Sequence, residues 1–101
     1  MNRDKPVTQT IGHLIDGQLV NDTARTQPVF NPATGQVSGH VALASQATVE
    51  QAIAAAEKAF PAWRDTPPLK RARVMGRLKT LLEENADRIA QMITAEHGKV
   101  L

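Results

Sequence analysis

Three histidines and the lack of cysteine limit the chemistry that this chain can perform. His13, His40 and His97 are scattered, and none has another histidine three or four residues away or a carboxylate cluster beside it. A metal site needs two or more ligands that converge from different elements, so this spacing favours no metal centre. With no cysteine among 101 residues, the chain has no disulfide, thiolate–zinc site or cysteine nucleophile.

A serine nucleophile is equally poorly supported. Ser38 and His40 alternate along a predicted strand and so face one side, but no acid is placed to complete a triad. The glycine fingerprint of dinucleotide-binding folds and the Walker loop are both absent. We therefore predict no catalytic, cofactor-binding or metal-ligating residue in this chain.

The basic segment 70–79, "KRARVMGRLK", is the strongest local charge feature. Three of its basic residues line one outer helix face, as in a nucleic-acid recognition helix: Lys70, Arg73 and Arg77. Acidic residues follow at once, and Lys79–Glu83 and Glu84–Arg88 have ion-pair spacing. No aromatic side chain is interleaved for base stacking, and the net charge is only +2. This pattern favours a solvated helix face.

Two residues of the same segment do not fit that face. Arg71 lies on the apolar side of the helix near its start, which predicts a partly buried ion pair or carbonyl contacts. Gly76 lies in the helix interior on the outward face, where glycine costs about 1 kcal/mol relative to alanine. Only the close approach of another surface would explain it.

Turn chemistry predicts two β-hairpins in the first half of the chain, after a polar leader at 1–10. Asp16 and Gly17 have the residue types of a type I′ turn between apolar flanks. In "FNPATGQV", Asn31 can bond to the backbone two residues on, Pro32 has a preset φ, and Gly35 can be left-handed. A strand follows this stretch, so it reads as a corner in the chain and not as a phosphate-binding loop.

The hydrophobic period then changes to that of helices. Thr48 and Gln51 suggest a capping box at the first helix start, and Pro61 should end or kink that helix. Its apolar residues form one stripe: Val49, Ile53, Ala56, Phe60 and Trp63.

A long helical segment follows from Pro68, with a break expected at Asn85, which can cap a new helix, and an end at Gly98. At the helical period, one face of this segment is apolar, and it consists of Val74, Met75, Leu78, Leu81, Leu82, Ile89, Met92 and Ile93. We expect this face to bury against structure outside the chain, because no closing element follows Gly98. No apolar run is long enough to span a bilayer and no signal peptide is evident, which favours a cytoplasmic protein without membrane contact.

These pieces resemble the extreme N-terminus of the aldehyde dehydrogenase superfamily. The matching stretches are "LIDGQLV", "VFNPATGQV" and the run from "AIAAAEKAFPAW" to "AEHGK". The "EHGK" ending and "ASQATVEQAIAAAEKAFPAW" are similar to the CoA-acylating, methylmalonate-semialdehyde dehydrogenase branch. Gly76 departs from the pattern, which has a bulky apolar residue there. The resemblance implies an α/β parent with a Rossmann-type cofactor domain, of which residues 11–101 form an incomplete, α+β N-terminal portion.

The resemblance also implies the chemistry of the parent enzyme. A cysteine thiolate attacks the aldehyde, hydride passes to NAD, and coenzyme A takes the acyl group, giving propionyl-CoA or acetyl-CoA and carbon dioxide in valine catabolism. The catalytic cysteine, the general-base glutamate and the nicotinamide pocket of the family all lie beyond residue 101. The resemblance therefore implies an inactive scaffold here, within a parent enzyme that is a homo-oligomer, a tetramer.

Two alternatives stay open from the sequence. One is another aldehyde dehydrogenase branch, of the succinate-semialdehyde or betaine-aldehyde type. The other is a small helical interaction or nucleic-acid-binding module that uses the basic segment 70–79.

Overall fold

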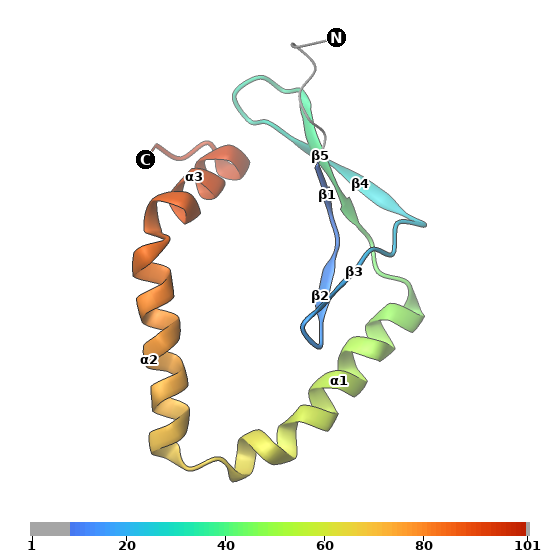
Figure 1. Cartoon of the computed structure of the whole chain (residues 1–101). Helices are drawn as coiled ribbons and strands as arrows, with labels where there is room; N and C mark the ends of the chain where they lie inside the picture. Colours follow the sequence, from blue (N-terminus) through green and yellow to red (C-terminus); the bar gives the residue numbers. More distant parts are fainter. Residues whose placement is uncertain (1–8, 101) are drawn as a thin grey trace.

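The computed structural model describes residues 9–100, in which a β-rich end leads into an arch of three helices (Figure 1). The radius of gyration is 17.8 Å, whereas a compact domain of about 100 residues has about 13 Å. The predicted order of two hairpins followed by helices, an α+β arrangement, is confirmed. The helices are extended away from the sheet and do not fold into a layer over it.

The larger sheet has three strands in the order β1 (Gln9–Ile11), β5 (Val37–Ala42) and β4 (Thr26–Phe30). β4 and β5 form the predicted second hairpin, and β1 adds to β5 in parallel. The assignment of Gln9 and Thr10 to a polar leader was therefore wrong, because both lie in β1. Their hydrogen-bonding partner is far along the chain, so no local pattern reveals it. Residues 1–8, the rest of the predicted leader, lie outside the described residues.

The first hairpin, β2 (His13–Ile15) and β3 (Gln18–Val20), forms a separate two-stranded sheet. Its turn residues Asp16 and Gly17 both have positive φ, at 51° and 71°. Those angles are what a type I′ turn requires, so the prediction from the Asp-Gly pair is confirmed.

The turn between β4 and β5 is held by the predicted contacts. The side-chain oxygen of Asn31 accepts a hydrogen bond from the Ala33 amide at 2.8 Å, and the Asn31 amide donates to the Gln36 carbonyl at 2.7 Å. Gly35 is left-handed, with φ 73°. The stretch is a corner that reverses the chain. Pro28 is tolerated in β4 because β4 is an edge strand, where a missing amide donor breaks no ladder on the outer side.

Helix α1 (Gln46–Asp65) begins earlier than predicted. Its N-cap is Ser45, whose hydroxyl accepts a hydrogen bond from the Thr48 amide at 3.2 Å. The capping box at Thr48 and Gln51 was therefore wrong. Ser45 already satisfies a free amide of the first turn, which moves the helix start three residues toward the amino end.

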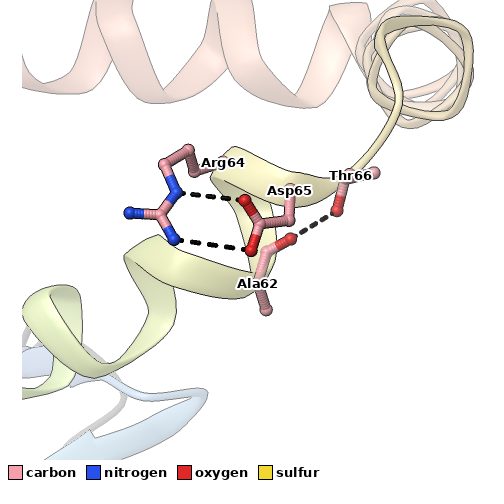
Figure 2. Close-up of polar contacts among 4 residues, drawn as sticks. All are labelled: Ala62, Arg64, Asp65 and Thr66. Carbon is pink, nitrogen blue, oxygen red and sulfur yellow. Dashed lines mark hydrogen bonds and ion pairs between the residues drawn. The ribbon is translucent and has the colours of Figure 1, made fainter.

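Helix α1 continues through Pro61, so of the two outcomes predicted there, an end or a kink, the end was wrong. Local contacts lie on both sides of the proline. The Arg64 guanidinium lies 5.7 Å from the centre of the Phe60 ring. Figure 2 shows that Arg64 also pairs with Asp65, and that the Thr66 hydroxyl donates to the Ala62 carbonyl at 2.7 Å. The last turn of α1 therefore keeps contacts of its own although the proline donates no backbone hydrogen bond.

Helices α2 (Pro68–Glu84) and α3 (Ala86–His97) meet at Asn85, as predicted. The Asn85 side chain, however, does not cap α3. Its amide donates to the Leu81 carbonyl at 2.8 Å, so it satisfies the end of α2. Gly98 ends α3 in the left-handed conformation, with φ 82° and its amide bonded to the Thr94 carbonyl, which confirms that prediction.

Burial is confined to the β-rich end and the first turn of α1. The buried side chains of the described residues are Ile15, Ala42 and Thr48, each 4% to 8% exposed. α1 lies along the first hairpin through its alanines, since Ala52 and Ala55 line a hollow together with Ile15 and its neighbours. At the far end of the arch, Gly98 lies against Pro32 of the β4–β5 turn.

Candidate functional site

The most extensive candidate surface is an apolar face along α2 and α3. Neither helix has a buried residue. The exposed fraction runs from 39% to 56% in seven members of the predicted apolar stripe: Val74, Met75, Leu78, Leu81, Leu82, Met92 and Ile93. The prediction that this face would be uncovered in the chain by itself is confirmed. A contiguous apolar patch of this kind marks a surface that packs against another body.

A second apolar stripe lies uncovered on α1. Phe60 and Trp63, two of the three aromatic residues of the chain, are 58% and 44% exposed. Val49 and Ile53 belong to the same stripe and are also exposed. The face that α1 turns to the hairpin carries small alanines instead, so its large side chains remain free.

The densest polar cluster joins the β-rich end to the start of α1. One carboxylate oxygen of Asp22 accepts hydrogen bonds from the Ser45 amide at 3.0 Å and from the Thr48 hydroxyl at 2.8 Å. These bonds, that from the Ser45 amide first, lower the pKa of Asp22 to about 2. Sequence reasoning missed Asp22, because it lies 23 residues before Ser45 and no spacing rule links them.

The structure keeps the histidines apart from one another. His13 lies in β2, His40 in β5 and His97 at the end of α3. Within residues 9–100, no three His, Cys, Asp or Glu side chains are grouped so that they could hold a metal ion. The Ser38 hydroxyl donates to the Val29 carbonyl at 3.2 Å, which is a bond within the hairpin and not a link to His40. None of these residues forms a catalytic arrangement in the described part.

The basic segment forms one of its two predicted ion pairs. Lys79 and Glu83 lie 3.7 Å apart, whereas Glu84 and Arg88 make no ion pair within the described residues. Arg71 is half-buried, as predicted. Its Nε atom is buried without a hydrogen-bond partner among residues 9–100, so the predicted ion pair or carbonyl contact is not made there. An unpaired guanidinium nitrogen beside the uncovered face again indicates a surface that needs a partner.

No helix in the described part of the chain is long and apolar enough to cross a membrane. What the geometry provides is a scaffold with two uncovered apolar stripes, braced at one end by a hydrogen-bonded sheet. It provides no reaction centre among the residues described.

Comparison with known proteins identifies the class to which this scaffold belongs. The model of the aldehyde dehydrogenase family matches residues 19–101, which is most of the chain. The chain therefore belongs to the aldehyde dehydrogenase family, and the resemblance seen in its sequence is confirmed.

Particular relatives are similar over nine-tenths of the chain. A malonate-semialdehyde dehydrogenase of Pseudomonas aeruginosa is 53% identical over 92 residues, which are 91% of this chain and 18% of the relative. The acylating methylmalonate-semialdehyde/malonate-semialdehyde dehydrogenase of Rattus norvegicus mitochondria is 42% identical over 93 residues, 91% of this chain and 17% of the relative. The chain thus spans less than a fifth of the length of these relatives.

Solved structures agree with the fold. The crystal structure of a methylmalonate-semialdehyde dehydrogenase from Oceanimonas doudoroffii is 62% identical with a TM-score of 0.87, over 89% of this chain and 18% of that one. The structure of a putative methylmalonate-semialdehyde dehydrogenase from Sinorhizobium meliloti, complexed with NAD, is 42% identical with a TM-score of 0.88. The match covers 92% of this chain and 19% of that one. The extended helices of this chain are therefore the arrangement found in aldehyde dehydrogenase structures.

Proposed function

We propose that this chain is the N-terminal scaffold of an NAD-dependent, CoA-acylating methylmalonate-/malonate-semialdehyde dehydrogenase. The whole enzyme would oxidise the semialdehyde with coenzyme A, giving propionyl-CoA or acetyl-CoA, NADH and carbon dioxide. The observation that carries this proposal is the uncovered apolar face of α2 and α3, in a chain that matches such enzymes at 53% and 62% identity. We further propose that the enzyme is a cytoplasmic homo-oligomer, a tetramer, with no nucleic-acid or membrane partner.

The start of α1 does not fit the phosphate groups of a dinucleotide such as NAD. The place where a dinucleotide phosphate binds in Rossmann-type units is the start of a helix that follows a strand. Here that position is the start of α1 after β5, and the Asp22 carboxylate already accepts the Ser45 amide there. A phosphate would meet a negative charge in place of a free amide. We derive no reaction step from this chain, and its contribution is framework.

A chimera tests the proposal. Residues 9–100 would replace the matching segment of the Pseudomonas aeruginosa relative, and the product made from methylmalonate semialdehyde, NAD and coenzyme A would be measured. We expect acyl-CoA and NADH from the chimera and neither from the 101-residue chain alone. The matched control carries Leu78→Asp and Leu82→Asp, which should abolish assembly.

Two outcomes would count against the proposal. A folded chimera that makes neither acyl-CoA nor NADH would count against this segment as the scaffold of such an enzyme, and would favour a different aldehyde dehydrogenase branch, such as the succinate-semialdehyde or betaine-aldehyde type. NADH release by the isolated chain would refute its role as scaffold alone.

A further inference from the structure

Helix α2 has a second face, called here the Gly76 face. A Cβ atom at Gly76 would meet nothing within 4 Å, so the helix surface is low and open at this point. The face is an open surface of this single helix, and it consists of Arg73, Gly76, Arg77, Thr80, Leu81 and Glu84. All six residues are exposed.

The Gly76 face adjoins the apolar stripe at Leu81, which belongs to both. At about 100° per residue, Arg73, Thr80 and Glu84 fall within a narrow arc, while Leu78 and Leu82 point away from it. A body that covers Leu78 and Leu82 would therefore leave Arg73, Thr80 and Glu84 free.

The positions of the Gly76 face have the same spacing in both directions along the helix. Reversing the direction of α2 exchanges Arg73 with Glu84, and Arg77 with Thr80. A two-fold axis across the helix between Arg77 and Thr80 would place these residues opposite one another. We propose that α2 pairs antiparallel with α2 of a second copy of this chain through the Gly76 face.

Charge complementarity is the main argument for a second copy. Arg73 would face Glu84 of the other copy, twice per pair, and neither residue makes an ion pair within the described part of the chain. A nucleic-acid backbone would meet the Glu84 carboxylate on this face, and an acidic peptide would meet it as well. The arrangement of charges is therefore matched to its own inverted copy.

The shape of the face agrees with this pairing. Near the axis, Thr80 would lie over Gly76 of the other copy, where the missing side chain lets two backbones approach closely. Leu81, which is 56% exposed, would pack on the aliphatic stem of Arg77. This explains a glycine inside a helix that local propensity disfavours.

The inference rests on the proposed homo-oligomer and names one of its contact surfaces. Three turns of helix bury less than the roughly 1,200 Å² of a stable interface, so the pairing is weak by itself and adds to a larger assembly. The test therefore measures association of the chain and not enzymatic activity, which separates its failure from failure of the proposed function.

A charge exchange tests the ionic part. In sedimentation equilibrium of the full 101-residue chain, Arg73→Glu and Glu84→Arg should each weaken dimerisation about tenfold, and the double variant should restore it. Lys79→Glu is the matched control, since it makes the same charge change on α2 away from this face. A monomeric parent chain, or a double variant that stays as weak as the single ones, would overturn the proposal.

A cysteine introduced near the axis tests the geometry, since the chain has none of its own. Thr80→Cys should form a disulfide-linked dimer on mild oxidation, because the two copies of residue 80 would lie beside the axis. Lys79→Cys, one residue away, should remain monomeric. Equal cross-linking of both variants would mean association through the exposed apolar stripe and would refute the pairing.

Discussion

The β-rich end and the helical arm of this chain are stabilised in opposite ways. At the β-rich end, five strands share ladders of hydrogen bonds, and Ile15, Ala42 and Thr48 are buried within one chain. In the arm, no residue of α2 or α3 is buried. The arm satisfies its backbone internally and leaves its large apolar side chains exposed.

This difference separates what the chain provides for itself from what it requires from elsewhere. Helices satisfy their own backbone hydrogen bonds, but most of their stability in proteins comes from packing of one face. The strands instead pair with one another within the described residues, in two hairpins and in the distant pair of β1 and β5. Four comparisons would sharpen or break this contrast, mostly through local free energies of opening from hydrogen exchange.

The largest effect should come from Gly39, in the central strand β5. A Cβ atom there would lie 2.6 Å from the Gln9 carbonyl oxygen of β1. Gly39→Val should force the parallel pair apart and cost the sheet about 3 kcal/mol. Exchange at the amides of β1 should rise first. The control His40→Val, at the next position, should cost much less, and equal costs would contradict the close approach.

A smaller effect should separate a buried side chain from an exposed one. Ile15 is 7% exposed and Leu82 is 50% exposed. Ile15→Ala should cost the β-rich end about 2 kcal/mol, while Leu82→Ala should change α2 by less than about 0.5 kcal/mol in this chain. Similar costs at both positions would mean that the arm is packed after all.

The junction between the two regions should respond to acid. The pKa of Asp22 is about 2 in the folded chain and 3.8 ordinarily, so its carboxylate favours the folded state above pH 4. That contribution should be lost as the pH falls from about 4 to about 2, because protonation removes the acceptor for Ser45 and Thr48. Protection of the first turn of α1 should fall over this range. Asp22→Asn should flatten the dependence, and an unchanged acid transition in that variant would exclude Asp22 as its cause.

The smallest effect, and the only gain, should come from Gly76→Ala. Nothing lies within 4 Å of the added methyl group, and alanine favours the helix by about 1 kcal/mol. Circular dichroism at a concentration where the chain is monomeric should show higher helicity. The control Gly98→Ala should lower it, since Gly98 has φ 82°. A loss of helicity in Gly76→Ala would show that the glycine has a role within the chain.

Local rules predicted the parts of the fold that local chemistry determines. The Asp16–Gly17 turn, the Asn31 corner and the Gly98 end each need a particular φ or side-chain bond within a few residues, and all three were confirmed. The break at Asn85 was also confirmed, although its side chain serves the preceding helix.

Two errors arise where distant residues take part. β1 pairs with β5, and the N-cap of α1 is Ser45, whose amide is bound by Asp22 from the sheet side. At Pro61 the contacts are local, from Phe60, Arg64 and Thr66, and the helix rule for proline alone did not foresee a helix that continues there. The candidate site was predictable as an uncovered stripe, since helical period alone places its members on one face. No residue of this chain indicates what covers that stripe.

The contact between Gly98 and Pro32 has a consequence for the order of folding. Ribosomes deliver a protein from its amino end, and the sheet needs nothing beyond Ala42 to complete its ladders. The β4–β5 corner beside the end of α3 is therefore synthesised, with all its ladder partners, before α3 leaves the ribosome. A corner that forms at that stage would give the end of α3 a defined place to pack.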